Sequence, residues 1–258
     1  MQVLAVVNQK GGVGKTVTAV TLAHGLALLG RRVLLVDLDA QGNVADALGM
    51  PRRDGVYRWL TGYGDGMVVE ASGRSGLGVV LGDKRTVEAR EVVAARPFRE
   101  IAVREGLERI GDGWEVVVLD TAPGADLLQI GALVAADWFM VPVSLEHLAV
   151  VGVVDLLATA ASLVRARAGS ARMLGVLPTH WERTTRESQV QLEVIVGEFG
   201  EFVLPPVPLD VRCREAVGHG RTLWEWAGRC RALDGVETAD GMVGGYRAVL
   251  RRVMEVLG

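Results

Sequence analysis

A glycine-rich segment near the amino terminus, NQKGGVGKTV at residues 8–17, has the residue types that bind phosphate. Gly11, Gly12 and Gly14 allow a tight turn that points successive backbone amides inward. The helix expected to follow would add the positive end of its dipole to the same anion site. This segment therefore predicts a phosphate-binding loop.

Two side chains at the end of this loop could complete a nucleoside triphosphate site. Lys15 would neutralise charge on the β- and γ-phosphates, and the Thr16 hydroxyl would ligate Mg²⁺. Gln9 stands where the strict GxxxxGK[ST] pattern has glycine. Lys10 and Lys15 are two of only three lysines among the 28 basic residues. Either this is chance within an arginine-rich composition, or the loop needs a compact ammonium that the planar guanidinium cannot replace.

Three carboxylates follow apolar runs that read as buried strands. Asp37 and Asp39 lie in VDLDAQGN at residues 36–43, and Asp120 ends the run VVVLD. Alternate residues of an extended strand point the same way, so Asp37 and Asp39 can both face the phosphates. Asp120 is placed to hold Mg²⁺ through water. The alternative for the first pair is a capping turn before a helix.

The pattern of apolar runs predicts the elements that position these residues. Short β-branched runs occur at 3–7, 32–37, 77–81, 114–120, 138–143 and 173–178, and helical periodicity occupies 17–30, 126–135, 146–167 and 185–198. Such an alternation is typical of an α/β, doubly wound, mostly parallel sheet flanked by helices. Residues 50–75 read as a surface loop with a short helix near 57–60, and 246–257 as an amphipathic helix. We expect a single domain over 1–258.

Lys10 and the sequence KGGVGKT resemble the deviant Walker A signature of the ParA/MinD family of P-loop ATPases, and the chain is most similar to its ParA (Soj-type) partition branch. The resemblance implies ATP and Mg²⁺ as cofactors and a nucleotide-sandwich homodimer. In that dimer Lys10 would reach the partner's ATP, Asp39 would orient the attacking water and Asp37 would support the hydrated metal. The implied nucleotide contacts are Lys10, Gly11, Gly12, Val13, Gly14, Lys15, Thr16 and Val17, and the implied metal ligands are Thr16, Asp37 and Asp120.

The chain departs from the family pattern in several places. Val17 replaces a threonine whose hydroxyl touches the α-phosphate, so we expect weaker nucleotide binding by the ~0.5–1.5 kcal/mol of one hydrogen bond. Pro123-Gly124 stands where the family has Pro-Pro. We expect this change to loosen the loop that follows Asp120, which is the second switch of the family. The segment at 205–220 resembles the family's region near the adenine, which makes Pro208 and Leu209 candidate base contacts, and Asp210 replaces the usual Asn.

The resemblance also implies a partition switch in which the ATP dimer binds DNA non-specifically and a ParB-like centromere-binding partner stimulates hydrolysis. Four arginines fall in the matching segments of the carboxyl-terminal half: Arg183, Arg186, Arg212 and Arg214. Composition gives no independent support, because residues 151–258 hold 13 Arg against 13 Asp plus Glu. Each arginine could equally belong to a solvated surface.

Composition limits the other classes of protein. The 258 residues are 50% hydrophobic and 23% charged with net charge −3, which excludes a disordered or collagen-like chain. We find no apolar run long enough to span a bilayer and no signal peptide, so we expect a cytoplasmic, nucleoid-associated protein without a membrane partner. Cys213 and Cys230 read as structural thiols. Three alternatives remain: a MinD-like membrane-surface ATPase using the basic terminal helix, a P-loop small-molecule kinase or ligase, and a protein that binds ATP without hydrolysing it.

Overall fold

A seven-stranded sheet forms the centre of the computed structural model, which describes residues 1–63, 70–111, 113–145, 149–238 and 241–258. The strand order is β3-β4-β2-β5-β1-β6-β7, and every neighbouring pair is parallel except β3 with β4. The strands are β1 (Gln2–Val6), β2 (Val33–Asp37), β3 (Glu70–Arg74), β4 (Leu77–Val80), β5 (Val116–Asp120), β6 (Trp138–Ser144) and β7 (Arg172–Thr179). The predicted doubly wound, mostly parallel sheet is confirmed.

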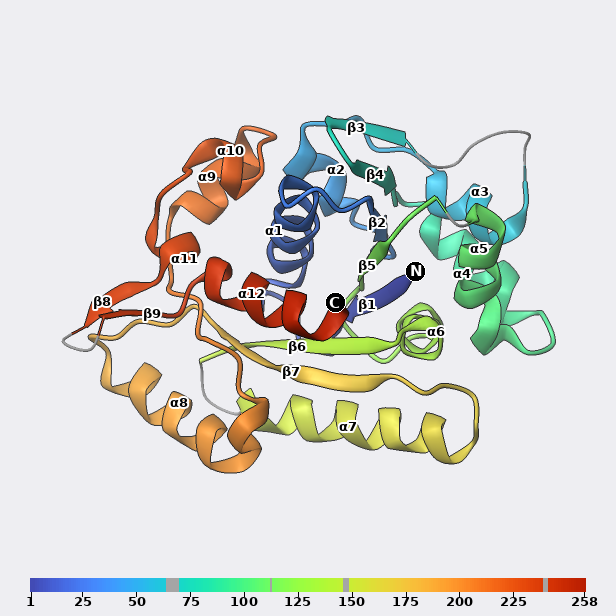
Figure 1. Cartoon of the computed structure of the whole chain (residues 1–258). Coiled ribbons are helices and arrows are strands. Elements are labelled where there is room, and N and C mark those ends of the chain that lie inside the picture. Colours follow the sequence, from blue (N-terminus) through green and yellow to red (C-terminus); the bar gives the residue numbers. More distant parts are fainter. Residues whose placement is uncertain (64–69, 112, 146–148, 239–240) are drawn as a thin grey trace.

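Helices cover both faces of this sheet (Figure 1). One layer contains α1 (Lys15–Leu28), α2 (Asn43–Leu48), α9 (Arg212–Gly218), α10 (Leu223–Trp226), α11 (Arg231–Asp234) and α12 (Tyr246–Leu257). The other contains α3 (Gly55–Thr61), α4 (Thr86–Ala94), α5 (Ala102–Ile110), α6 (Leu127–Ala135), α7 (Ala149–Arg165) and α8 (Arg186–Phe199). A separate hairpin pairs β8 (Val236–Thr238) with β9 (Gly241–Val243).

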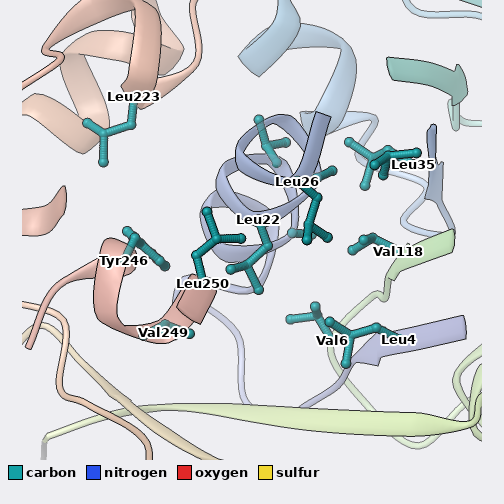
Figure 2. Packing of buried hydrophobic residues seen from close by; sticks show 14 of the residues in the cluster. Leu4, Val6, Leu22, Leu26, Leu35, Val118, Leu223, Tyr246, Val249 and Leu250 are labelled. Atoms are coloured by element: carbon teal, nitrogen blue, oxygen red, sulfur yellow. The ribbon is translucent and has the colours of Figure 1, made fainter. Parts of the chain in front are cut away.

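The two-layer arrangement follows from strands whose successive side chains point to opposite faces. Leu4 and Val6 of β1 join the core beneath α1 and α12, whereas Val3 and Ala5 join the core beneath α6 and its neighbours. Figure 2 shows the first of these cores, where side chains from α1 and α12 meet those of the strands. Because both faces are buried, each strand needs a continuous apolar run, which explains why six strands were predictable.

The terminal helix α12 has its apolar face buried against α1. Tyr246, Val249 and Val253 are buried there, and Leu257 packs at the edge of the same core. Gly25 of α1 permits this close approach, since a Cβ at that position would lie 2.9 Å from Leu250 Cδ2. Among the helices of the described residues, none has the length and apolarity needed to cross a membrane. The predicted amphipathic helix is therefore a core element.

The prediction of a loop at 50–75 with only a short central helix is wrong. The helix is present as α3, but Glu70–Arg74 form β3, an edge strand antiparallel to β4. The segment EASGR has no apolar run, so its strand character comes from pairing with its neighbour. The positions 64–69, and the first three residues of the helix predicted at 146–167, lie outside the described residues.

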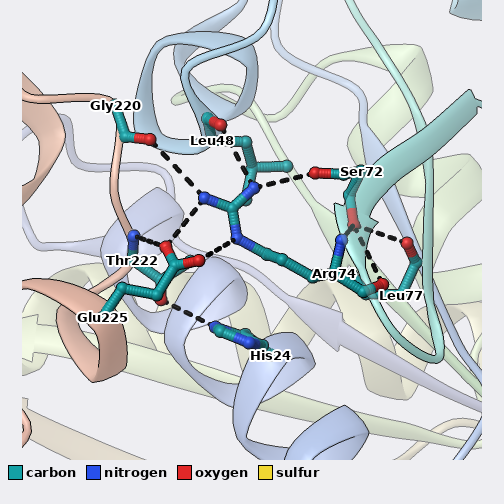
Figure 3. Close-up of polar contacts among 8 residues, drawn as sticks. All are labelled: His24, Leu48, Ser72, Arg74, Leu77, Gly220, Thr222 and Glu225. Carbon is teal, nitrogen blue, oxygen red and sulfur yellow. Dashed lines mark hydrogen bonds and ion pairs between the residues drawn. The ribbon is translucent and has the colours of Figure 1, made fainter.

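A partly buried polar network explains how β3 is held (Figure 3). The Arg74 guanidinium donates to Glu225 Oε1 and Oε2 at 3.0 and 2.8 Å and to the Leu48 carbonyl at 3.1 Å. Glu225 also accepts from the Thr222 amide, and the Thr222 hydroxyl lies 2.7 Å from His24 Nδ1. Burial lowers the pKa of His24. The network thus joins β3 and α2 to α10 and the phosphate-loop helix α1.

Candidate nucleotide site

The glycine-rich segment forms a turn that leads directly into α1. Gly12 and Gly14 have φ values of +77° and +84°, a region that glycine enters at little cost, and Gly14 caps the helix. Lys15 is buried, and its Nζ donates to the Lys10 carbonyl at 2.9 Å. Burial lowers the pKa of Lys15, while the carboxylates of Asp120 and Asp39 oppose that shift. The turn therefore holds an ammonium and several amides where an anion can bind.

One contact within the turn and two to neighbouring strands fix its position. The Asn8 side chain accepts from the Lys10 amide at 2.9 Å and donates to the Pro142 carbonyl at 2.7 Å. The Thr179 hydroxyl, at the end of β7, donates to the Val13 carbonyl at 3.0 Å. The phosphate loop is consequently positioned against two strands of the sheet, β6 and β7.

Gly124 provides a further anchor for the phosphate loop. Its φ is +97°, which proline cannot adopt, and its amide donates to the Gln9 carbonyl at 2.9 Å. Proline at this position would remove both features. The Gly124 amide thus ties the loop after β5 to the phosphate loop.

The predicted carboxylates lie at the carboxyl ends of adjacent strands. Asp37 and Asp120 are directly opposite one another in the β2–β5 register, and both are fully buried. Asp37 accepts from the amides of Asp39 and Val44 at 3.1 and 3.2 Å. Burial, with the nearby Asp120, raises the pKa of Asp37. Asp39 is 8% exposed and accepts from the Gln41 amide, and a cavity of about 210 Å³ lies against it.

Asp120 has the character of a cation ligand. Both carboxylate oxygens are buried and lack a hydrogen-bond partner among the described residues. Burial raises its pKa to about 7, although the nearby Thr16 hydroxyl and the Lys15 ammonium favour the charged form. A buried carboxylate is costly unless something pairs with it. The residues therefore fit a hydrated Mg²⁺, which prefers one or two carboxylates together with phosphate oxygens and water.

A cavity of about 370 Å³ continues from the phosphate loop toward α9. It brings Thr16 and Val17 together with Pro208 and Leu209, which are far apart in the sequence. The walls are mainly apolar side chains, as expected for a base-binding pocket. Asp210 also lines the cavity, but its carboxylate is occupied by the amides of Arg212 and Ala232. The proposed base contacts and phosphate contacts thus share one cavity.

Lys10 and the four predicted DNA-binding arginines are exposed. The Lys10 amide is anchored, so its side chain extends from a fixed point. Arg183 and Arg214 line a neighbouring cavity, Arg186 begins α8, and Arg212 pairs with Asp210 at 3.5 Å. The structure brings Arg183 and Arg214 together.

Sequence reasoning missed two residues beside the site. Gly82 follows β4, and a Cβ there would lie 2.8 Å from the Asp39 carbonyl and against that of Asp37. His180 lines the base cavity with a φ of +53°, and its Nδ1 lies 3.1 Å from Ser144 Oγ. A glycine directly after a predicted strand was a detectable signal for the first, whereas nothing in the local sequence distinguished His180.

The fold and the phosphate-facing residues together define a P-loop nucleotide-binding protein. A family model described as an AAA domain matches residues 1–170. The chromosome-partitioning ATPase Soj of Thermus thermophilus is 40% identical over 87% of this chain and 88% of its own length. The chromosome partitioning protein ParA of Caulobacter vibrioides is 32% identical over 89% of each. The chain belongs to the Soj/ParA family of chromosome-partitioning ATPases.

Solved structures support the same fold. Apo McdA from Cyanothece superposes with a TM-score of 0.84 over 100% of both chains, at 20% sequence identity. A cobyrinic acid a,c-diamide synthase from Mycobacterium smegmatis with bound ADP and magnesium has a TM-score of 0.76 and 30% identity, covering 89% of this chain and 97% of that one. The first likeness shows the fold alone.

Proposed function

We propose that this partition ATPase is a switch in which ATP assembles a homodimer, the dimer binds DNA non-specifically, and hydrolysis releases it. The observation that carries the proposal is the pair of unpartnered, buried Asp120 oxygens beside a phosphate loop whose Lys10 is exposed. The first feature fits Mg²⁺ with a triphosphate, and the second places a cationic residue at the surface beside that site.

ATP and Mg²⁺ are the cofactors of this site. Thr16 and Asp120 would hold the metal, with Asp37 behind them, and the ion would neutralise charge between the β- and γ-phosphates. The loop amides and Lys15 bind the phosphates, while the cavity formed with Pro208 and Leu209 encloses the base.

Asp39 is the residue that orients the attacking water in this proposal. A bond forms between the water oxygen and the γ-phosphorus as the bond to the bridging oxygen breaks, releasing ADP and phosphate. The proton of the attacking water passes toward the Asp39 carboxylate. Lys10 of the partner subunit would stabilise the developing charge, as an arginine finger does. Intrinsic turnover is expected to be slow until a ParB-like protein acts.

Mutation of the two key side chains tests this mechanism. Asp39→Ala should abolish phosphate release while the ATP-bound dimer persists. If phosphate release is unchanged, Asp39 does not orient the attacking water. Lys10→Ala should abolish stimulated turnover. If the Lys10→Ala protein forms ATP-dependent dimers and its ATP hydrolysis is stimulated normally, Lys10 does not act on the ATP of the partner subunit. Lys84→Ala, which changes the third lysine, far from the phosphate loop in the sequence, is the matched control.

DNA binding has its own test. Affinity for a duplex should require ATP and should fall steeply with salt, because it depends on phosphate contacts by Arg183, Arg186, Arg212 and Arg214. DNA binding that is equally strong without ATP, or that does not weaken as salt rises, would contradict the proposed switch. Nucleoid association in cells is expected only for the ATP state.

The burial of α12 argues against a membrane-surface ATPase, and an assay of phosphate release tests the alternative of a small-molecule ligase or kinase. A MinD-like membrane role would need the apolar face of α12, but Tyr246, Val249 and Val253 are buried in the core. A small-molecule ligase or kinase would need an acceptor, so release of phosphate from ATP without any added acceptor distinguishes it from a partition ATPase.

A further inference from the structure

We propose that the solvent-facing side of α8 binds a basic amphipathic helix of another protein, an inference that requires neither the nucleotide nor the DNA of the function proposed above. Figure 1 shows α8 beside α7 on one side of the sheet. The inner side of α8 packs on the core of that layer through Leu192, Ile195 and Phe199. The fold thus accounts for one side of this helix.

The opposite side of α8 carries a second apolar stripe that the fold does not use. Val190 and Val194 are 42% and 47% exposed, and Gly197 is exposed as well. Spacings of four and then three residues bring these positions to one side of a helix. A valine at an exposed helix position leaves apolar area in water and has a lower helix propensity than alanine, glutamate or arginine. The stripe lowers the stability of the free protein, and a binding partner explains why it is present.

Gly197 gives separate support for a partner. A Cβ built on Gly197 meets no atom within 4 Å, and its φ is not positive, so neither space nor backbone conformation calls for glycine there. Glycine inside a helix is less favourable than alanine. The missing side chain does allow the backbone of a second helix to approach closely. The stripe is therefore suited to pairing with another helix.

The charges beside the stripe specify a basic partner. In the heptad notation abcdefg, Val190 and Gly197 occupy d positions and Val194 occupies an a position. Glu193 and Glu198 then occupy the adjoining g and e positions, which form ion pairs between paired helices. Both glutamates are exposed, and across the part of the chain that the structure describes neither has a hydrogen-bond or ion-pair partner. A helix with Lys or Arg at its own e and g positions would supply those partners.

The same glutamates disfavour three other occupants. In a parallel pair of identical helices, Glu193 of one copy would face Glu198 of the other, and antiparallel pairing would place like residues opposite each other. A second copy therefore meets repulsion in either orientation. DNA and anionic lipid surfaces would be repelled as well, because α8 has Arg186 as its single basic residue against Glu187, Glu193 and Glu198.

Two synthetic peptides test the proposal in the absence of nucleotide and DNA. Each has about 21 residues, or three heptads, with leucine and alanine at the a and d positions. One peptide carries lysine at e and g, and the other carries glutamate. Binding of the labelled peptides is measured by fluorescence anisotropy. Val194→Gln is compared with Val92→Gln, which changes a valine of α4 that is also 42% exposed, and melting temperatures verify that both variants fold.

We expect the lysine peptide to bind the unchanged protein at least about tenfold more tightly than the glutamate peptide, with an affinity that falls as salt rises. Val194→Gln should weaken binding of the lysine peptide about tenfold or more, whereas Val92→Gln should stay within about threefold. Gly197→Ala should raise the melting temperature but weaken peptide binding, because the added methyl group separates the helices. Changing both Glu193→Lys and Glu198→Lys should make the glutamate peptide the tighter ligand.

Each contrary result overturns the inference. If the lysine peptide does not bind at concentrations up to about 1 mM, or if Val194→Gln and Val92→Gln bind it alike, α8 is not a docking surface. If the two peptides bind equally, the glutamates do not select a basic partner. If the unchanged protein dimerises without nucleotide and Val194→Gln does not, the stripe binds a second copy. ATP-dependent dimerisation and DNA binding are measured in separate assays, so none of these results decides the partition switch.

Discussion

Replacing Asp120 by asparagine should stabilise the protein when nucleotide and metal are absent. Asp120 is fully buried with unpartnered oxygens, and its pKa is about 7 against an ordinary value of 3.8. An acid whose pKa is raised by folding lowers stability increasingly as pH climbs from its unfolded to its folded pKa. The penalty is about 2 kcal/mol at pH 5 and reaches an upper limit of about 4 kcal/mol at pH 8.

The neutral amide avoids this penalty but introduces N–H groups that need acceptors. An unsatisfied buried donor costs about 1–3 kcal/mol, so the net gain of Asp120→Asn at pH 8 should be about 1–3 kcal/mol. The gain should shrink or reverse at pH 5. Urea unfolding at the two pH values measures both quantities.

When Mg²⁺ and nucleotide are bound, the unchanged protein should become more stable than Asp120→Asn. Mg²⁺ with an ATP analogue should raise the melting temperature of the unchanged protein more than that of Asp120→Asn, because the variant has lost a charged ligand. Asp126→Asn is the control, since Asp126 caps α6 through the Gln129 amide and asparagine caps equally well. An Asp120→Asn protein that is less stable at pH 8, or equally stabilised by the metal complex, would refute the reasoning.

Three further variants test contacts around the site. Gly82→Ala should slow ATP hydrolysis at least about tenfold, because the added Cβ displaces the Asp39 backbone. Calorimetry should give an ADP affinity within a few-fold of that of the unchanged protein. Normal turnover would contradict the close approach of Gly82 to Asp39. Gly124→Pro should lower the unfolding free energy by at least about 1 kcal/mol, through loss of its φ and of its bond to Gln9, and unaltered urea unfolding would argue against that anchor. Arg74→Met should cost about 2–3 kcal/mol, because Glu225 keeps only the Thr222 amide as a partner and three carbonyls lose the guanidinium; a cost below about 1 kcal/mol would mean the network is only a surface pair.

The sequence allowed six of the seven strands of the sheet to be predicted because each is buried on both faces and so carries a continuous apolar run. Strand β3 has no such run, and its place depends on pairing with β4 and on the contacts of Arg74. The short helices α9, α10 and α11 span only four to seven residues, too few for a periodic signal.

Local chemistry predicted the phosphate loop and its carboxylates, whereas tertiary proximity did not follow from the sequence. Asp37 and Asp120 could be expected at one sheet edge, and the register places them opposite one another. The approach of Gly82 to Asp39 and the bond from Gly124 to Gln9 join segments that are far apart in the chain or related only by the sheet. No spacing rule reveals such contacts.

The central claim is that ATP, and not ADP, joins two copies of this chain face to face with Lys10 reaching across. Sedimentation velocity of the same preparation without nucleotide, with ADP and with a non-hydrolysable ATP analogue, each with Mg²⁺, tests it most directly. We predict a monomer in the first two conditions and a dimer in the third. A single species with an unchanged sedimentation coefficient in all three would contradict the account.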